Sequence, residues 1–373
     1  GGVVVPIHYG ARRELAACLN HAGAKLLLTR QASDLDAAAL AREAPALARV
    51  VGEEELRELT AGASAASPGL SLSGDDPAIL FYTTGSTGRP KGVLWRLRHL
   101  DNAPRILRHF LKVDERDVTL CAVPLSHSGG LVYLQECVSL GTTVVLLPSF
   151  SPVHFVEAAR AHGVTCFHIV PVILEALLRL PRAEERRLPA VRWVAVFGAP
   201  SSPEQIVAFK ALCPNAALLS GYGLTETSPP TTLPPIDSLR PGSVGMPPPW
   251  IGAAILDEDD RELPPGRIGE VAFRGWIVAE YYNEPELTRA AMRNGWFHTG
   301  DLGRRDEAGY LYICGRKKDV IIVGGLNVHA DEVEFVLSGH PAVKEAAVVG
   351  VADARRGEQV KAVVVLKEGA TAT

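Results

Sequence analysis

The stretch from Thr142 to Gly221 alternates between two kinds of hydrophobic pattern, and this alternation limits the fold more than any other feature. Short apolar runs rich in β-branched residues predict buried strands at 143–147, 164–170, 191–197 and 216–219. Helices are predicted between these strands, over 152–162, 172–180 and 203–212. Ser151 and Pro152 are typical of the start of the first of them. Strands that alternate with helices through short connections form a parallel sheet covered by helices, so we predict an α/β fold.

Length and composition indicate a large globular protein. The chain has 373 residues, 47% of them apolar, which is enough for two or three packed units with a sizeable core. Its net charge is −4 and it has no basic stripe, which argues against nucleic acid or an anionic membrane as a partner. The six cysteines are scattered, and no stretch resembles a signal peptide or a transmembrane segment. We expect a cytoplasmic protein with reduced thiols, and the sequence does not indicate its oligomeric state.

Three stretches outside this alternating region differ from it in composition and hydrophobic pattern. Residues 61–77 are rich in Gly, Ser and Pro and predict a surface loop between two units. Prolines and glycines crowd residues 241–267, which favours turns between short strands of a β-rich part. After Arg316 we predict a helix over 330–337 and strands at 346–351 and 361–366.

Residues 79–93 read ILFYTTGSTGRPKGV, an apolar strand that enters a loop of hydroxyls and glycines. Glycines let backbone N–H groups turn toward an anion, hydroxyls donate hydrogen bonds, and Lys91 supplies a positive charge. The stretch is therefore interpreted as a phosphate-binding loop, although it does not match the common P-loop pattern. A flexible Ser/Gly surface loop is the alternative.

Residues 221–227 read GYGLTET and follow a predicted parallel strand. Ligands of such sheets bind outside the carboxyl ends of the strands. The ring of Tyr222 could stack on a base, Thr225 could donate to a phosphate oxygen, and Glu226 is a hard oxygen ligand suited to Mg²⁺. Glu226 could equally be a carboxylate at a helix entry.

Two further stretches carry polar residues of the same kind. In WFHTGDLG (296–303), Asp301 could accept hydrogen bonds from ribose hydroxyls. In YLYICGRKKDVIIVGGLNVH (310–329), Arg316 could reach ribose or phosphate, although the Arg-Lys-Lys triplet could also be a solvated charge run. The histidines show no metal-ligand spacing, which argues against a zinc site.

Together these stretches resemble the adenylate-forming superfamily of acyl- and aryl-CoA synthetases, luciferases and peptide-synthetase adenylation domains. The resemblance covers nearly the whole chain and is closest to the AMP-forming acyl-CoA synthetases. It also rests on PLSH at 124–127, FGAP at 197–200, GEVAFRG at 269–275 and GWFHTGDLG at 295–303. It implies an α/β fold in which a large N-terminal domain has parallel helix-covered sheets and a small β-barrel-like part. A small mobile α+β C-terminal domain would follow.

The resemblance also implies a division of the chain. Residues 1–314 would be the AMP-binding large domain without its N-terminal part, and residues 315–373 a truncated C-terminal mobile domain. Gly315 departs from the acidic residue that many members have before the hinge arginine, and Ile322 replaces a lysine of some aryl-acid members. The family's C-terminal lysine has no counterpart, so we expect this chain to bind nucleotide but to adenylate very slowly.

The implied reaction has two steps. A carboxylate, of a fatty or aryl acid, attacks the α-phosphorus of ATP and gives an acyl-adenylate and pyrophosphate. The thiol of coenzyme A then takes the acyl group, so ATP, Mg²⁺ and coenzyme A are the implied co-substrates and cofactor. Such displacement depends mainly on positioning and charge neutralisation. A role in fatty acid metabolism is expected.

Residue by residue, the resemblance assigns most of the site. The implied ATP- and AMP-binding residues are Thr83, Thr84, Gly85, Ser86, Thr87, Gly88, Lys91, Gly198, Ala199, Pro200, Gly221, Tyr222, Gly223, Thr225, Asp301, Arg316, Lys318 and Asn327. Gly324 and Gly325 would border the pantetheine arm of coenzyme A, and Glu226 would hold Mg²⁺. His127, Thr225 and Glu226 would be catalytic, with a pocket-wall histidine as the alternative for His127.

Two other functions stay open. The first is an adenylation domain that loads an amino or hydroxy acid onto a carrier protein. Such domains usually have an Asp in the acyl segment, where this chain reads SHSGG, and YGPTE where it reads YGLTE. The second is a non-catalytic nucleotide-binding remnant, against which the intact TTGSTGRPKG and Glu226 argue.

Overall fold

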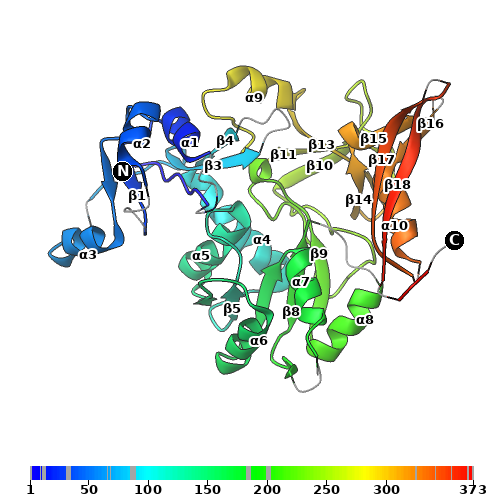
Figure 1. Cartoon of the computed structure of the whole chain (residues 1–373), viewed down its shortest axis with the longest axis horizontal. Coiled ribbons are helices and arrows are strands. Elements are labelled where there is room, and N and C mark those ends of the chain that lie inside the picture. Colours follow the sequence, from blue (N-terminus) through cyan, green and yellow to red (C-terminus); the bar gives the residue numbers. More distant parts are fainter. Residues whose placement is uncertain are drawn as a thin grey trace.

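A computed structural model describes the chain except for short gaps (Figure 1). The described residues are 2–8, 10, 14–30, 35–64, 66–67, 69–84, 90–181, 186–198, 203–323, 326–340, 342–353, 355–367 and 369–371. Several predicted site residues lie outside them, namely Gly85, Ser86, Thr87, Gly88, Ala199, Pro200, Gly324 and Gly325. The side chains of Thr84 and Asn327 are also outside the description.

The predicted parallel sheet is confirmed. Its five strands run in the order β6-β5-β7-β8-β9, and every neighbouring pair is parallel. The strands are β5 (Val118–Cys121), β6 (Thr143–Leu146), β7 (Cys166–Ile169), β8 (Trp193–Phe197) and β9 (Ala217–Gly221). The helices that join or flank them are α4 (Asn102–Leu111), α5 (Ser128–Leu140), α6 (Pro152–Ala161), α7 (Pro171–Leu178) and α8 (Pro203–Leu212).

Both faces of this sheet are buried, as the continuous apolar runs of its strands require. Successive residues of β8 point to opposite faces. Trp193 and Ala195 pack in a core with α4 and α5, whereas Val194 and Val196 pack in a second core with α6, α7 and α8. The first core continues into the neighbouring antiparallel sheet through side chains such as Phe273. The parallel sheet therefore forms the rigid centre of the large part.

The elements before β3, coloured blue in Figure 1, form a small lobe with its own hydrophobic cluster. It contains α1 (Leu15–Ala22), β1 (Leu26–Leu28), α2 (Ala37–Glu43), β2 (Arg49–Val51) and α3 (Glu53–Ala61), with β1 and β2 parallel. Next come β3 (Pro77–Thr84) and β4 (Pro90–Arg96), followed by the 3₁₀ turn η2 (Leu97–Asp101). The predicted phosphate loop connects β3 to β4, which form an antiparallel hairpin.

The β-rich part predicted after residue 241 is a five-stranded antiparallel sheet. It consists of β10 (Ile251–Leu256), β11 (Gly269–Gly275), β12 (Met292–Arg293), β13 (Trp296–Arg305) and β14 (Leu311–Arg316), with α9 (Pro285–Ala291) before β12. The long strand β13 pairs with β11 on one side and with β12 and β14 on the other. Two 3₁₀ turns, η4 (Thr225–Thr227) and η5 (Lys317–Asp319), lead into and out of this region.

The C-terminal residues form a four-stranded antiparallel sheet in the order β16-β15-β18-β17. Its elements are β15 (Val320–Val323), β16 (Leu326–His329), α10 (Ala330–Ser338), β17 (Val343–Asp353) and β18 (Gly357–Leu366). The helix and both strands predicted here are confirmed, and the strands are longer than predicted because they form one long hairpin. The boundary predicted at residue 315 falls inside β14, which stays paired with β13 as far as Arg316.

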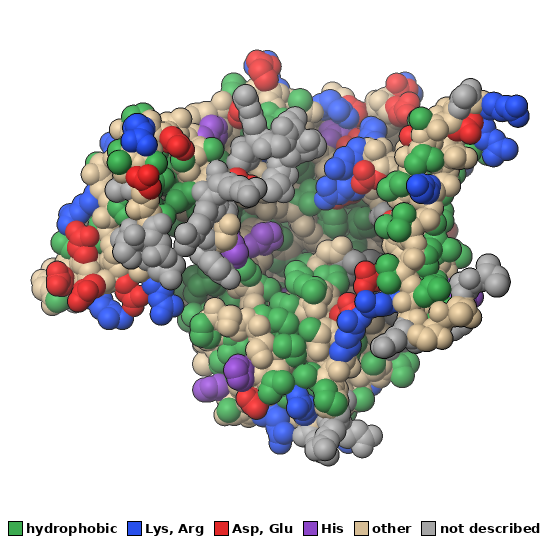
Figure 2. Space-filling view, in the orientation of Figure 1, with side chains coloured by type: hydrophobic (Ala, Val, Ile, Leu, Met, Phe, Trp, Pro, Cys, Tyr) green, Lys and Arg blue, Asp and Glu red, His purple; other side chains and the backbone are tan. Residues whose placement is uncertain are grey.

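The surface is hollowed near the centre of the face drawn in Figure 2, with hydrophobic side chains beside and below the hollow. None of the helices in the described ranges is long and apolar enough to cross a membrane.

Candidate active site

A cavity of about 1360 Å³ opens at the carboxyl ends of the parallel strands. Ile169 and Phe197, the last residues of β7 and β8, line its floor, together with the segments that follow β5 and β9. The other walls come from the β3–β4 hairpin, the middle of β13 and the residues after β14. This is where open α/β sheets bind ligands, as predicted for the stretch after β9.

Many of the predicted site residues meet in this one cavity. Those that line it are Thr83, Lys91, His127, Gly223, Thr225, Glu226, Asp301, Arg316 and Lys318. Gly198, Gly221 and Tyr222 lie beside it and are not among its lining residues. Packing explains why residue 221 is a glycine, since a Cβ at Gly221 would lie 2.3 Å from the ring of Phe197. The individual roles of these residues remain predictions.

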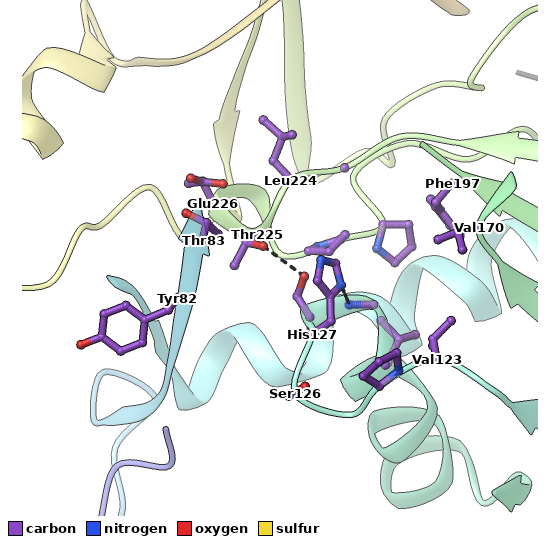
Figure 3. Close-up of a pocket in the computed structure, with 18 of the residues that line it drawn as sticks. Tyr82, Thr83, Val123, Ser126, His127, Val170, Phe197, Leu224, Thr225 and Glu226 are labelled. Carbon is purple, nitrogen blue, oxygen red and sulfur yellow. Dashed lines mark hydrogen bonds between the residues drawn. The ribbon is translucent and has the colours of Figure 1, made fainter. Parts of the chain in front are cut away.

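Thr225 and Glu226 are held firmly by the scaffold on the hairpin side of the cavity (Figure 3). The indole N–H of Trp95 in β4 donates to the Thr225 carbonyl at 3.0 Å, and the Thr225 and Ser128 hydroxyls are 3.2 Å apart. The Glu226 carbonyl accepts from the Ala279 amide at 2.8 Å. The Glu226 side chain can therefore face the cavity while its backbone is fixed.

His127 caps the N-terminus of α5 and lines the cavity (Figure 3). Its Nδ1 accepts the Gly129 amide N–H at 3.1 Å, so in the neutral ring the proton lies on Nε2. Burial lowers the pKa of His127, which favours that neutral ring at pH 7. His127 thus lines the cavity, and the choice between a catalytic residue and a pocket-wall histidine remains a prediction.

Asp301 links β13 to β14 and to the segment that follows β9. Its carboxylate accepts the Tyr222 hydroxyl at 2.6 Å and lies 3.2 Å from the Arg316 guanidinium. Burial raises the pKa of Asp301, and these two partners oppose that rise. The Tyr222 ring stacks on Phe273, with centroids 6.0 Å apart and planes 24° apart. The predicted base stacking would therefore have to use the remaining face or edge of that ring.

Sequence reasoning missed two residues that support the site. Glu270 accepts the Gly300 amide at 3.1 Å and pairs with Lys317 at 3.1 Å, although it was noticed only as part of a motif. Tyr281 donates its hydroxyl to Glu226 at 3.0 Å. The doubled tyrosine before the PELT stretch was the only sequence signal, and it does not indicate a partner 55 residues away.

The donor set suits a magnesium ion that is held mainly by a substrate. Among the described residues there is no group of three or more His, Cys, Asp or Glu side chains that could hold a metal alone. Mg²⁺ usually keeps several waters and binds one or two carboxylates plus substrate phosphates. Glu226 beside Lys91 and Thr83 fits that description.

The fold and the cavity define a class: an α/β protein with a cavity at the carboxyl ends of its parallel strands, lined by a hairpin lysine and by a carboxylate. The profile described as AMP-binding enzyme matches residues 1–283, and that described as AMP-binding enzyme C-terminal domain matches residues 332–373. The chain belongs to this family of AMP-binding enzymes, and the resemblance to the adenylate-forming superfamily is confirmed.

Individual relatives agree with this membership. The chain is 36% identical to sulfoacetate–CoA ligase of Cupriavidus necator over 99% of its own length and 74% of that protein. It is 34% identical to the long-chain-fatty-acid–CoA ligase FadD13 of Mycobacterium tuberculosis, over 98% of this chain and 73% of the relative. The structure of ATP-bound MatB from Rhodopseudomonas palustris superposes with a TM-score of 0.92 at 33% identity, covering 100% of this chain and 75% of that one.

Proposed function

We propose that this protein is an AMP-forming acyl-CoA synthetase, which activates a carboxylic acid with ATP and passes the acyl group to coenzyme A. The observation that carries the proposal is the single cavity, which joins a phosphate-type wall (Thr83, Lys91, Glu226) to an apolar compartment headed by His127. The relatives named above are CoA ligases, which supports coenzyme A as the acceptor. The division into 1–314 and 315–373 belongs to the same proposal.

The phosphate wall would neutralise the negative charge of the ATP phosphates. Lys91 places an ammonium in the cavity, and the Thr83 and Thr225 hydroxyls can donate to phosphate oxygens. Mg²⁺, held by Glu226 and the phosphates, would withdraw charge from the phosphate oxygens. Asp301 and Arg316 would take the ribose side, where both already line the cavity.

His127 would orient the acid. Because its Nδ1 is occupied by the Gly129 amide, its Nε2–H is the donor available to a substrate carboxylate. A neutral imidazole orients one carboxylate oxygen without removing the negative charge that makes the other oxygen a nucleophile. His127 therefore serves as a positioning donor for the attack on the α-phosphorus.

The acyl compartment favours an acid that carries no charge apart from its reacting carboxylate. Its described side chains are apolar or uncharged, namely Leu107, Val123, Ser126, Val132, His168, Ile169, Val170, Phe197 and Leu224. The cations and carboxylates that line the cavity all come from the hairpin, the N-terminal lobe, Glu226 or the β13–β14 region. Burial keeps His168 neutral by lowering its pKa to about 3. A second charge on the acid would thus be buried without a partner, which is costly.

The test is a panel of carboxylic acids assayed for acid-dependent pyrophosphate release, together with binding of the matching acyl-sulfamoyl-adenosine mimics. We expect fatty or aryl acids and their mimics to be preferred at least about tenfold over sulfoacetate and over amino acids. Preference for sulfoacetate, which carries a second charge, would contradict the assignment of an acyl compartment for acids without one. Preference for an amino acid with transfer to a carrier protein would contradict the function itself.

A further inference from the structure

Tyr281 lies directly behind two groups of the phosphate wall. Its hydroxyl donates to Glu226 Oε1 at 3.0 Å, and the Lys91 ammonium lies 5.8 Å from the centre of its ring. Tyr281 itself is not among the residues that line the cavity, whereas Glu226 and Lys91 both are. One aromatic side chain thus contacts the carboxylate and the cation that face the phosphates.

The backbone around Tyr281 is fixed to the hairpin that carries Lys91. The Leu94 amide donates to the Glu280 carbonyl at 3.0 Å, and the Tyr282 amide donates to the Gly92 carbonyl at 2.8 Å. Arg96 clamps the same segment, because its guanidinium donates to both carboxylate oxygens of Glu280 at 2.8 Å. The segment therefore runs alongside β4, and these contacts fix the backbone that carries Tyr281.

The Tyr281 hydroxyl acts only as a donor here. Burial, and secondarily the negative charge of Glu226, raise the pKa of Tyr281 well above its ordinary value. The phenol therefore stays protonated at all physiological pH values and binds Oε1 of Glu226. The carboxylate rotation is then fixed, which leaves its second oxygen as the ligand for a cation in the cavity.

We propose that Tyr281 is a positioning residue for the magnesium ligand, holding the Glu226 carboxylate in the rotamer that receives Mg²⁺ together with ATP. This inference rests on the proposed function. Hydrogen bonds to metal-binding carboxylates fix their orientation, and losing such a partner typically costs about 10- to 100-fold in metal affinity or activity. The face of the Tyr281 ring also favours the Lys91 ammonium at its place beside the phosphates.

The test uses Tyr281→Phe, which removes one oxygen and keeps the ring under Lys91. ATP binding is measured by calorimetry over a range of free Mg²⁺ concentrations. We expect the Mg²⁺ concentration for half-maximal ATP binding to rise about tenfold, while ATP binding without Mg²⁺ stays unchanged. In a Glu226→Gln background, Tyr281→Phe should have no further effect, because it acts through that carboxylate.

Tyr282→Phe is the matched control. Its ring meets His21 edge-on, and no residue within the described ranges hydrogen-bonds its hydroxyl. The inference is overturned if Tyr281→Phe and Tyr282→Phe need the same Mg²⁺ concentration for half-maximal ATP binding. It is also overturned if Tyr281→Phe weakens ATP binding equally with and without Mg²⁺. If the parent protein binds no ATP at any Mg²⁺ concentration, the proposed function fails and the inference fails with it.

Tyr281→Met covers the case in which Tyr281→Phe does not fold. It also removes the hydroxyl that donates to Glu226, so the Mg²⁺ concentration for half-maximal ATP binding should rise in the same way. An unchanged Mg²⁺ requirement in this variant would overturn the inference.

Discussion

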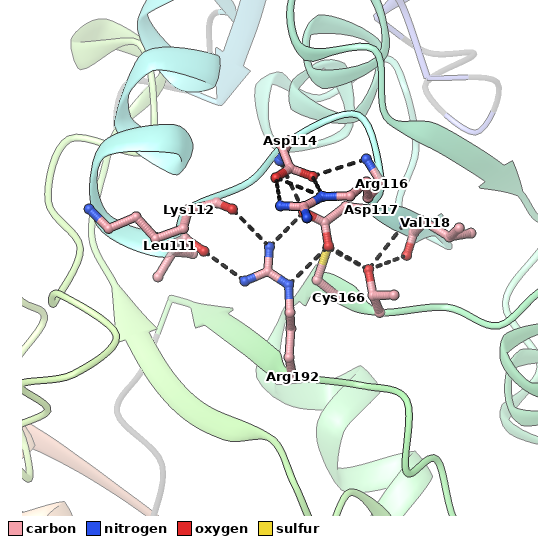
Figure 4. A network of polar contacts seen from close by, with 9 residues as sticks. Leu111, Lys112, Asp114, Arg116, Asp117, Val118, Cys166 and Arg192 are labelled. Atoms are coloured by element: carbon pink, nitrogen blue, oxygen red, sulfur yellow. Dashed lines mark hydrogen bonds and ion pairs between the residues drawn. The ribbon is translucent and has the colours of Figure 1, made fainter.

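Arg192 joins three elements at the amino-terminal ends of the parallel strands (Figure 4). Its guanidinium donates to the two carboxylate oxygens of Asp117 at 2.9 and 2.6 Å, and to the Leu111 and Lys112 carbonyls at 2.8 and 3.2 Å. Asp117 precedes β5, Arg192 precedes β8, and the two carbonyls close α4. One side chain thus satisfies a buried carboxylate and the end of a helix.

Arg192→Met tests how much this cluster stabilises the large part. Asp117 is only 4% exposed, so it would keep its charge in the interior with the Thr165 hydroxyl and the Asp114 amide as remaining donors. Breaking a buried ion pair by removing one partner costs about 3–5 kcal/mol, and the partial exposure of Arg192 favours the lower end, about 3 kcal/mol. At about 2–4 °C per kcal/mol, the unfolding midpoint should fall by roughly 6–12 °C.

Differential scanning calorimetry at pH 7 measures this effect, with Arg116→Met as the control. Arg116 also pairs with an aspartate, Asp114, but its side chain is 84% exposed, and exposed pairs contribute little. Burial alone would raise the pKa of Asp117, but hydrogen bonds from Arg192 and Thr165 lower it. The stabilisation is therefore present above the unfolded pKa near 3.9 and lost as pH falls below it. Equal midpoints for the two variants at pH 7 would refute the reasoning.

Three further predictions concern the site and its support. Burial raises the pKa of Glu136 to about 8, so the native state loses stability as pH rises from about 4.3 toward 8. Glu136→Gln should therefore stabilise the protein increasingly between pH 5 and 8 in thermal scans, and a pH-independent difference would contradict this. Gly130→Ala places a Cβ 2.1 Å from the Pro124 carbonyl and should cost about 1–3 kcal/mol, whereas Gly129→Ala meets no contact shorter than 3.4 Å. Chemical denaturation distinguishes the two, and equal stabilities would refute the clash. Asp301→Asn should weaken ATP binding about tenfold or more in calorimetry, because hydrogen bonds to charged groups contribute about 1.5–3 kcal/mol; unchanged affinity would remove Asp301 from the site.

The parallel sheet could be predicted because its signal is local. Each strand from 143 to 221 is a short apolar run, and each helix between them has its own start and stop residues, so neighbours in sequence determine the pattern. The convergence of the motifs also follows from the sequence once the sheet is parallel, since the carboxyl ends of its strands share one edge. His127, Thr225 and Glu226 meet in the cavity for that reason.

The supporting contacts could not be predicted, because their partners are far apart in sequence and carry no periodic signal. Arg192 lies 75 residues from Asp117, and Tyr281 lies 55 residues from Glu226. Neither pair has a spacing rule, and each depends on how two separately folded elements pack. Glu136 is a similar case: its carboxyl is fully buried beside His168, where helix periodicity alone would accept any apolar residue.

Two carboxylates of the antiparallel sheet, Asp301 and Glu270, hold the residues that lead into the C-terminal sheet. Asp301 faces Arg316 at 3.2 Å, and Glu270 holds both the Gly300 amide and the Lys317 ammonium at 3.1 Å. Arg316 ends β14, and β15 of the C-terminal sheet begins at Val320. Partly exposed ion pairs of this kind are weak and exchange readily with water, whereas the apolar cores on either side do not. A rearrangement between Arg316 and Val320 would therefore alter what Asp301 and Gly300 present to the nucleotide of the proposed function.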